Sequence, residues 1–185
     1  GIEQHMNDQE RKDLLMTAFA ERFDGATPTM WAQAPGRVDL MGSHTDYNQG
    51  YVLTQAIDRD TWIAARPRPD RQVRIHSMNL AGSGTFTLDS ITHDQQAPWS
   101  DYVRGVAHVL QGESYPLHGF DGIIHSTVPF GSGLSSSAAV TIAYLLALAR
   151  NIPQMTSSMK AGKWEKKSFL GSEVSGMCAS SVMTM

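Results

Sequence analysis

The sequence predicts one α+β domain in residues 1–150, followed by a divergent tail in residues 151–185. Three observations predict it. Apolar residues recur at helical spacing in separate segments, short strand-like segments lie between them, and a glycine-rich turn joins a last strand to an apolar helix. Strands gathered into one sheet, with helices packed on one face, make α+β the natural class.

The first element is an amphipathic helix over residues 8–23, "DQERKDLLMTAFAERF", with Asp8 available as its N-cap. The residues that its spacing places on one face are Leu15, Phe19 and Phe23. We interpret these side chains as part of the core.

The strands follow. A short strand between Pro28 and Pro35 ends before the polar segment that begins at residue 37. Three more segments have β-branched residues and partial alternation, and suggest an antiparallel meander: "TWIAARPR", "QVRIHSM" and "GTFTLD".

The second half of the domain begins with a helix that we expect to lie on this sheet. The residues that recur there at helical spacing are Trp99, Tyr102, Val103, Val106, Val109 and Leu110. A strand, "GFDGIIHSTV", comes next and has Phe120, Ile124 and Val128 on the same side. The glycine-rich turn and the apolar helix complete the domain.

Composition limits the classes of partner and cellular compartment that we expect for the protein. A net charge of -3 gives no electrostatic footprint for nucleic acid or an anionic membrane, so small molecules are the expected partners. The single cysteine, Cys178, cannot form an internal disulfide, and residues 138–149, the longest apolar segment, are too short to span a bilayer. We therefore expect a cytoplasmic protein.

Two segments carry candidate chemistry. Residues 37–50, "RVDLMGSHTDYNQG", concentrate hydrogen-bonding side chains between apolar residues. Residues 129–150, "PFGSGLSSSAAVTIAYLLALAR", place two spaced glycines and three serines before a helix. Free amides at a helix start favour anions, although a serine after a glycine turn can equally serve only as a helix cap.

With both motifs in view, the chain resembles the GHMP sugar kinases, and the galactokinases in particular. "APGRVDLMGSHTDYNQGYVLTQAID" is similar to the galactokinase signature, "WSDYVRGV" to that family's Trp-x-x-Tyr helix, and "VPFGSGLSSSAA" to the phosphate loop of all GHMP kinases. The likeness runs over residues 34–149. It implies the fold of the GHMP kinase N-terminal domain, with the C-terminal domain lying beyond residue 185.

The resemblance also implies the reaction and its residues. The γ-phosphoryl group of ATP would pass to the C1 hydroxyl of galactose, with Mg²⁺ bridging phosphate oxygens. Arg37 is implied as the catalytic cation beside that hydroxyl, and Ser43, His44 and Asp46 as further sugar contacts. Ser137 is implied as a magnesium ligand. Trp99 and Tyr102 could lie near the adenine, although core packing is the preferred interpretation of both. The implied ATP-binding residues are Pro129, Gly131, Ser132, Gly133, Leu134, Ser135, Ser136, Ser137 and Ala138.

The chain also departs from the family pattern. Ser43 stands where galactokinases usually carry a Glu, which predicts relaxed selectivity at C6 and access for a uronic acid or a pentose. Asp39 replaces a more usual Asn. No aspartate follows Asp121, and "FLGSEVSGMCASS" is the nearest likeness to the family's "GIMDQ" segment, whose aspartate handles the C1 proton. Glu165 is out of register with the family's second metal ligand.

These departures leave alternatives open. The chain is either part of a sugar kinase, truncated or frameshifted near residue 150 and nearly inactive alone, or a non-catalytic relative that binds sugar or nucleotide as a sensor. A GHMP kinase for another small alcohol, such as mevalonate or homoserine, is disfavoured by "GSHTDYN" and "WSDYVRGV".

Overall fold

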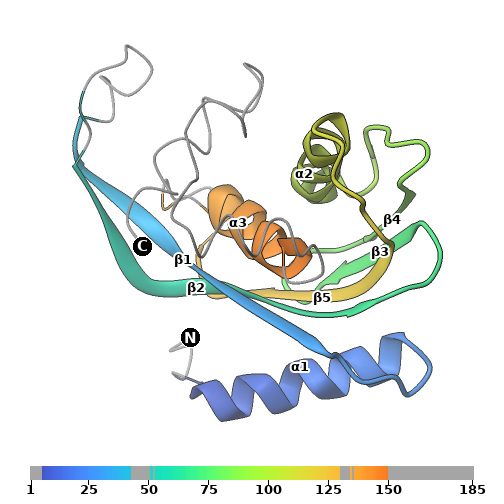
Figure 1. Cartoon of the computed structure of the whole chain (residues 1–185). Coiled ribbons are helices and arrows are strands. Elements are labelled where there is room, and N and C mark those ends of the chain that lie inside the picture. The colour runs from blue at the N-terminus through green and yellow to red at the C-terminus, as the bar shows by residue number, and fades with distance from the viewer. Residues whose placement is uncertain (1–5, 43–50, 52, 130–133, 135, 150–185) are drawn as a thin grey trace.

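A computed structural model describes residues 6–42, 51, 53–129, 134 and 136–149. These residues form a five-stranded sheet in the order β1-β2-β5-β3-β4, with helices packed on it (Figure 1). The elements in chain order are α1 (Asp8–Arg22), β1 (Met30–Met41), β2 (Leu53–Pro67), β3 (Gln72–Ser77), β4 (Ser83–Thr87), the 3₁₀ turn η2 (Pro98–Ser100), α2 (Asp101–Gly112), β5 (Phe120–Ser126) and α3 (Ser136–Ala149). The predicted α+β class is confirmed.

The sheet is not the predicted antiparallel meander. β1 pairs with β2 and β3 pairs with β4, both antiparallel, but β5 inserts between β2 and β3. It runs antiparallel to β2 and parallel to β3. α2 lies between β4 and β5 in the chain, and such a helical connection lets β5 return parallel to β3.

Helices cover both faces of the sheet, so the expectation of helices on one face was wrong. α2 and α3 lie on one side and α1 lies alone on the other (Figure 1). β5 serves both sides, because Phe120 and Ile124 belong to the core under α2 and α3 whereas Ile123 packs with α1. Burial of one such large apolar side chain contributes about 1.5–3 kcal/mol, which makes β5 central to both cores.

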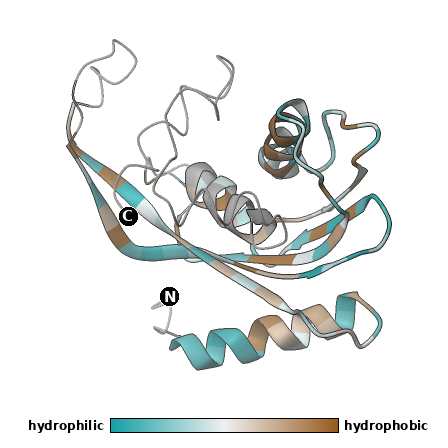
Figure 2. Ribbon diagram, in the orientation of Figure 1, coloured by the Kyte–Doolittle hydropathy of each residue, from teal (hydrophilic) through white to brown (hydrophobic). Residues whose placement is uncertain are grey.

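The first helix forms as its pattern predicts. Leu15, Phe19 and Phe23 are buried together against the sheet, and Figure 2 shows hydrophilic first turns followed by more hydrophobic ones. The N-cap, however, is Asn7 and not Asp8. The Asn7 side chain accepts a bond from the Glu10 amide while the Glu10 carboxylate accepts one from the Asn7 amide, both at 2.9 Å. This reciprocal pair satisfies two amides of the first turn.

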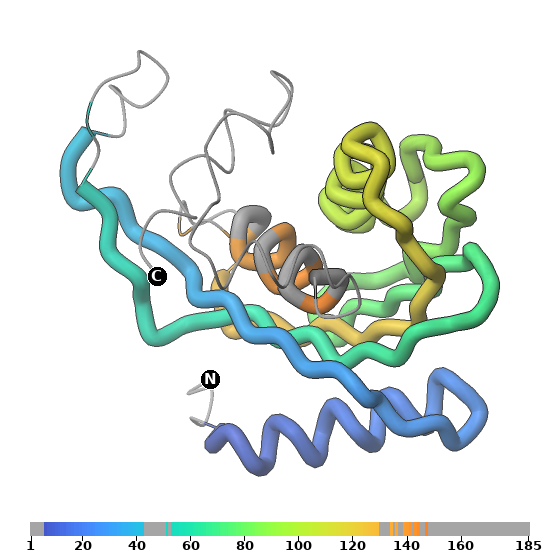
Figure 3. The backbone as a smooth tube through the Cα atoms, viewed as in Figure 1, coloured from blue at the N-terminus to red at the C-terminus, as the bar shows by residue number. Residues whose placement is uncertain are grey.

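β1 is longer than predicted and contains the start of the polar motif. It continues from Met30 to Met41 and pairs with β2 as an arm that extends past the helices (Figure 3). The pairing register shifts between Pro35 and Arg37. Proline cannot donate to a strand ladder, so a bulge on an edge strand suits it. The arm therefore bends where the motif begins.

None of the helices in the described part of the chain is long and apolar enough to cross a membrane.

Candidate active site

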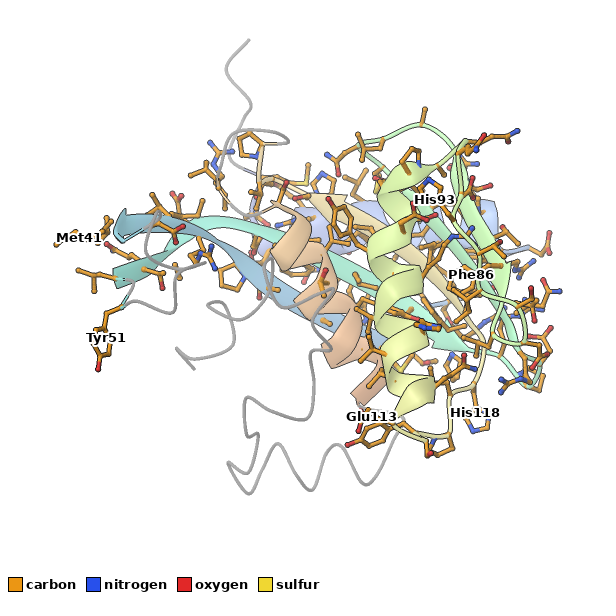
Figure 4. All side chains as sticks on the ribbon, turned by 90° about the horizontal axis from the view of Figure 1, so that it is seen from above. Met41, Tyr51, Phe86, His93, Glu113 and His118 are labelled. Carbon is orange, nitrogen blue, oxygen red and sulfur yellow. The ribbon has the colours of Figure 1, made fainter. Side chains whose placement is uncertain are left out.

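The structure describes only part of the predicted sugar-binding motif. Arg37 lies in β1, just beyond the register shift. Ser43, His44 and Asp46 lie outside the described residues, so their sugar contacts stay predictions. Met41 and Tyr51, the described residues on either side of them, are exposed at the far end of the β1–β2 arm (Figure 4).

Arg37 forms an ion pair within its own strand. Its Nε lies 2.9 Å from Oδ1 of Asp39, and both side chains are largely buried, at 15% and 24% exposure. Residues i and i+2 of a strand point to the same face, which brings the two side chains together. The ion-pair partner that the structure gives Arg37 is therefore Asp39.

The predicted phosphate motif occupies the predicted position between a strand and a helix. β5 ends at Ser126, Val128 is buried, and α3 begins at Ser136. Pro129, Leu134 and Ser136 are described. The residues of the motif that lie outside the described part are Gly131, Ser132, Gly133 and Ser135. Ser137 and Ala138 belong to the first turn of α3, although their side chains are not described.

One backbone contact joins the two motifs. The amide of Arg37 donates a hydrogen bond to the carbonyl oxygen of Leu134 at 3.1 Å. The two residues lie 97 positions apart in the sequence (134 − 37). Arg37 belongs to β1, and Leu134 belongs to the turn before α3. The segment just before α3 and the Arg37 backbone are therefore neighbours in the fold.

The core holds α3 in this place. Ala139, Ala143, Tyr144 and Ala147 are buried, and the Tyr144 ring lies 5.1 Å from that of Phe120 in β5. α3 packs on β1, β2 and α2. These described side chains of α3 are therefore covered by the rest of the domain.

Below the phosphate motif, a buried polar network ties α1 to the sheet. Arg11 is only 5% exposed and forms an ion pair with Asp60 of β2. Its Nε donates to Nδ1 of His125, and its Nη2 to the carbonyl of His125, both at 2.9 Å. The amide of Thr127 donates to the Asp60 carbonyl at 2.9 Å. The network thus fixes the end of β5, from which the phosphate motif departs.

The Asp60 carboxylate is well supplied with donors. Burial alone would raise the pKa of Asp60, but bonds from Arg11, Gln33 and the Trp62 indole outweigh it and hold the pKa below its ordinary value. Sequence reasoning missed this network, because an arginine among polar residues at the start of a helix gives no sign that it is buried.

The "WSDYVRGV" segment is chiefly structural in the described residues. Trp99 packs against the main core, as preferred, and its indole donates to the Ala81 carbonyl at 3.0 Å. Arg104 is buried and bonds the Ser100 hydroxyl at 3.1 Å and Asp94 at 2.8 Å. Tyr102 is 38% exposed, so core packing was the wrong interpretation for that residue.

The residues described by the structure contain no group of three or more His, Cys, Asp or Glu side chains that could hold a metal ion.

Two family models match the chain. The galactokinase galactose-binding signature matches residues 17–67, which contain the C-terminal end of α1 and all of β1 and β2. The GHMP kinases N terminal domain matches residues 101–167, which contain α2, β5 and α3. The two motifs that the Arg37–Leu134 bond joins therefore fall one in each match.

Comparison with individual proteins points to the same family as the two family models. A galactokinase from Chloroflexus aggregans is 52% identical over 131 residues, which are 70% of this chain and 34% of the relative. The structure of Lactococcus lactis galactokinase complexed with galactose is 32% identical, with a TM-score of 0.66 over 81% of this chain and 42% of that one. Methanococcus jannaschii mevalonate kinase shares the fold, at 23% identity and a TM-score of 0.55 over 66% of this chain and 40% of that one.

The chain spans about a third of the length of the curated relatives that it matches. The galactose-binding signature, the GHMP domain match and the sequence identity to galactokinases all fall on the part that carries the two motifs. The chain therefore belongs to the galactokinase family of GHMP kinases and carries the family's N-terminal domain.

Proposed function

We propose that this chain forms the substrate-binding half of a sugar kinase site, in which the γ-phosphoryl group of ATP is transferred to the C1 hydroxyl of galactose or a related sugar. The observation that carries the proposal is the hydrogen bond from the Arg37 amide to the Leu134 carbonyl. It brings a motif of sugar-binding type beside a motif of phosphate-binding type, and phosphoryl transfer requires that two substrates meet in line.

Charge supports the same assignment. The start of a helix such as α3 has amides without partners inside the helix and carries the positive end of the helix dipole, and both favour the phosphates of ATP. The Arg37 guanidinium lies on the adjoining strand, where it stabilises charge on the transferred group and lowers the proton affinity of the C1 hydroxyl. Mg²⁺, with Ser137 as its proposed protein ligand, would neutralise phosphate charge when bound.

The sugar is selected by residues of the β1–β2 arm. Asp46 accepts bonds from ring hydroxyls, and His44 adds a second contact. Ser43 leaves the C6 position without a negative charge, so galacturonate and arabinose are admitted along with galactose. A preference for galactose of roughly 10³-fold over both would contradict this selectivity, since it would show that C6 is strictly recognised.

The proposed activity of these 185 residues alone is low. No aspartate follows Asp121, so the residue that takes the C1 proton in the family has no counterpart here. Loss of a general base costs roughly 10²- to 10⁴-fold in rate. The same observation favours a second candidate function, in which the chain binds sugar and nucleotide as a sensor without turnover.

Calorimetric titration with galactose and with MgATP, followed by an assay for galactose 1-phosphate, tests the proposal. We expect both ligands to bind and Arg37→Met to weaken MgATP binding. Arg71→Met is the matched control, because Arg71 lies in the turn between β2 and β3 and pairs with exposed Asp89. Binding without product would support the sensor, and absence of binding for both ligands would refute both functions.

A further inference from the structure

We propose that Gly36 is a positioning residue that sets the spacing between β1 and the phosphate motif, so that Arg37 and the start of α3 act on the same phosphoryl group. The inference rests on the proposed function and adds a residue to it. Gly36 lies between Pro35 and Arg37, where the β1–β2 register shifts.

The space beside Gly36 is filled from three directions. A Cβ atom built on Gly36 would lie 3.0 Å from Cγ2 of Val128, 3.1 Å from Cδ1 of Ile57 and 3.1 Å from the carbonyl oxygen of Leu134. All three distances are shorter than ordinary van der Waals contact between such atoms. The need for glycine is one of space, since Gly36 is not among the described glycines with positive φ.

These neighbours differ in how easily they can move. Cγ2 of Val128 and Cδ1 of Ile57 are ends of side chains, so small rotations could relieve those contacts. The Leu134 oxygen belongs to the backbone and already accepts the Arg37 amide at 3.1 Å. A methyl group at position 36 must therefore displace this carbonyl, stretch its bond to Arg37, or move β1.

Each displacement has the same functional effect. Leu134 lies between the glycines of the phosphate motif and the first turn of α3 in the sequence. Arg37 carries the guanidinium that we propose stabilises the transferred phosphoryl group. A shift of a few tenths of an ångström between them misaligns groups that must act together, and misalignment reduces rate and binding steeply. The proposed sugar contacts of Ser43, His44 and Asp46 come later in the sequence, so we expect a change at this junction to affect them less.

The test compares Gly36→Ala with Gly105→Ala and with the double variant G36A/V128A. Gly105 is the matched control, since a Cβ there meets nothing within 4 Å. The double variant removes the nearest side-chain contact and roughly conserves volume, but it leaves the contact with the Leu134 oxygen. Each chain is measured for melting temperature, for hydrogen exchange of the Arg37 amide by NMR, and for binding of MgATP and galactose.

We expect G36A to increase Arg37 amide exchange and to weaken MgATP binding by about tenfold, with a smaller effect on galactose. G105A should match the unsubstituted chain in amide exchange and ligand binding and should melt no lower, because alanine is favoured over glycine inside a helix. G36A/V128A should regain the melting temperature without regaining amide protection or MgATP affinity. The inference would be overturned if G36A kept both the amide protection of Arg37 and the MgATP affinity, or if G36A/V128A regained both of them. Failure of the proposed function is distinguishable, because the unsubstituted chain itself would then bind neither ligand.

Discussion

Replacement of Arg11 by methionine tests the network that ties α1 to β2 and β5. Methionine keeps the length and apolar stem of the side chain but removes its charge and its five N–H donors. Asp60, which is only 14% exposed at its side chain, would lose its cationic partner while Gln33 and Trp62 remained. His125 would lose the donors to both its ring and its carbonyl.

The size of the effect follows from burial. Removal of one partner of a buried ion pair costs about 3–5 kcal/mol, because the remaining charge is left uncompensated. The bonds that Asp60 keeps place the expected loss near the lower end, at about 3 kcal/mol. In a chain of this size about 1 kcal/mol corresponds to roughly 2–4 °C, so the melting temperature should fall by about 6–12 °C.

Thermal unfolding followed by circular dichroism measures this change, with Arg71→Met as the control. Arg71 also pairs with an aspartate, Asp89, but the two side chains are 45% and 63% exposed. Exposed pairs contribute at most about 1 kcal/mol. Equal losses of melting temperature in R11M and R71M would refute the reasoning, as would full additivity in the double variant R11M/D60N, where removal of both charges should cost less than the sum of the single changes.

Three further predictions concern other buried groups. The Tyr144 hydroxyl is buried and lacks a hydrogen-bond partner among the described residues, so Tyr144→Phe should raise the free energy of unfolding by about 1 kcal/mol in a denaturant titration, and a decrease would contradict this. Burial raises the pKa of Asp121, but bonds from Arg74, Arg66 and Arg68 outweigh it and leave the pKa below its ordinary value of 3.8. Its stabilising contribution is therefore complete above the pKa of the unfolded chain and is lost as pH falls through the folded value, so the melting temperature should decline below about pH 4, and less steeply in Asp121→Asn. Because Asp39 pairs with Arg37, Asp39→Asn should remove a competing negative charge beside the guanidinium and tighten MgATP binding a few-fold. This effect should shrink at high salt, and an unchanged dissociation constant would rule it out.

The elements that were predictable from the sequence are those whose signal is local. The apolar face of α1 follows from helical spacing, and so do α2 and the strand–turn–helix order around the phosphate motif. The place of β5 in the sheet was not predicted, because pairing partners far apart in sequence leave no periodic trace. A hint existed, since Phe120, Ile123 and Ile124 make both faces of β5 apolar, as in a strand covered on two sides.

The candidate site divides in the same way. Its motifs could be recognised as short patterns, and the resemblance that they carried led to the correct family. The long-range contacts that position these motifs could not be recognised from the sequence. Arg11 meets Asp60 across 49 positions and His125 across 114, and the role of Gly36 depends on Leu134, Val128 and Ile57 arriving from other elements. Sequence patterns reveal which groups can react, whereas long-range packing decides where they lie.

The late position of β5 in the chain has a consequence for synthesis on the ribosome. Until residues 120–126 emerge, the β1–β2 and β3–β4 pairs exist as separate units, and the inner edges of β2 and β3 have no partner. Open strand edges and uncovered apolar faces favour association with other chains. Emergence of this one segment closes both edges and completes the core beneath α1, after which α3 completes the core on the other face. The stage before residues 120–126 leave the ribosome should therefore be the most aggregation-prone, and a pause in translation at that stage should prolong it.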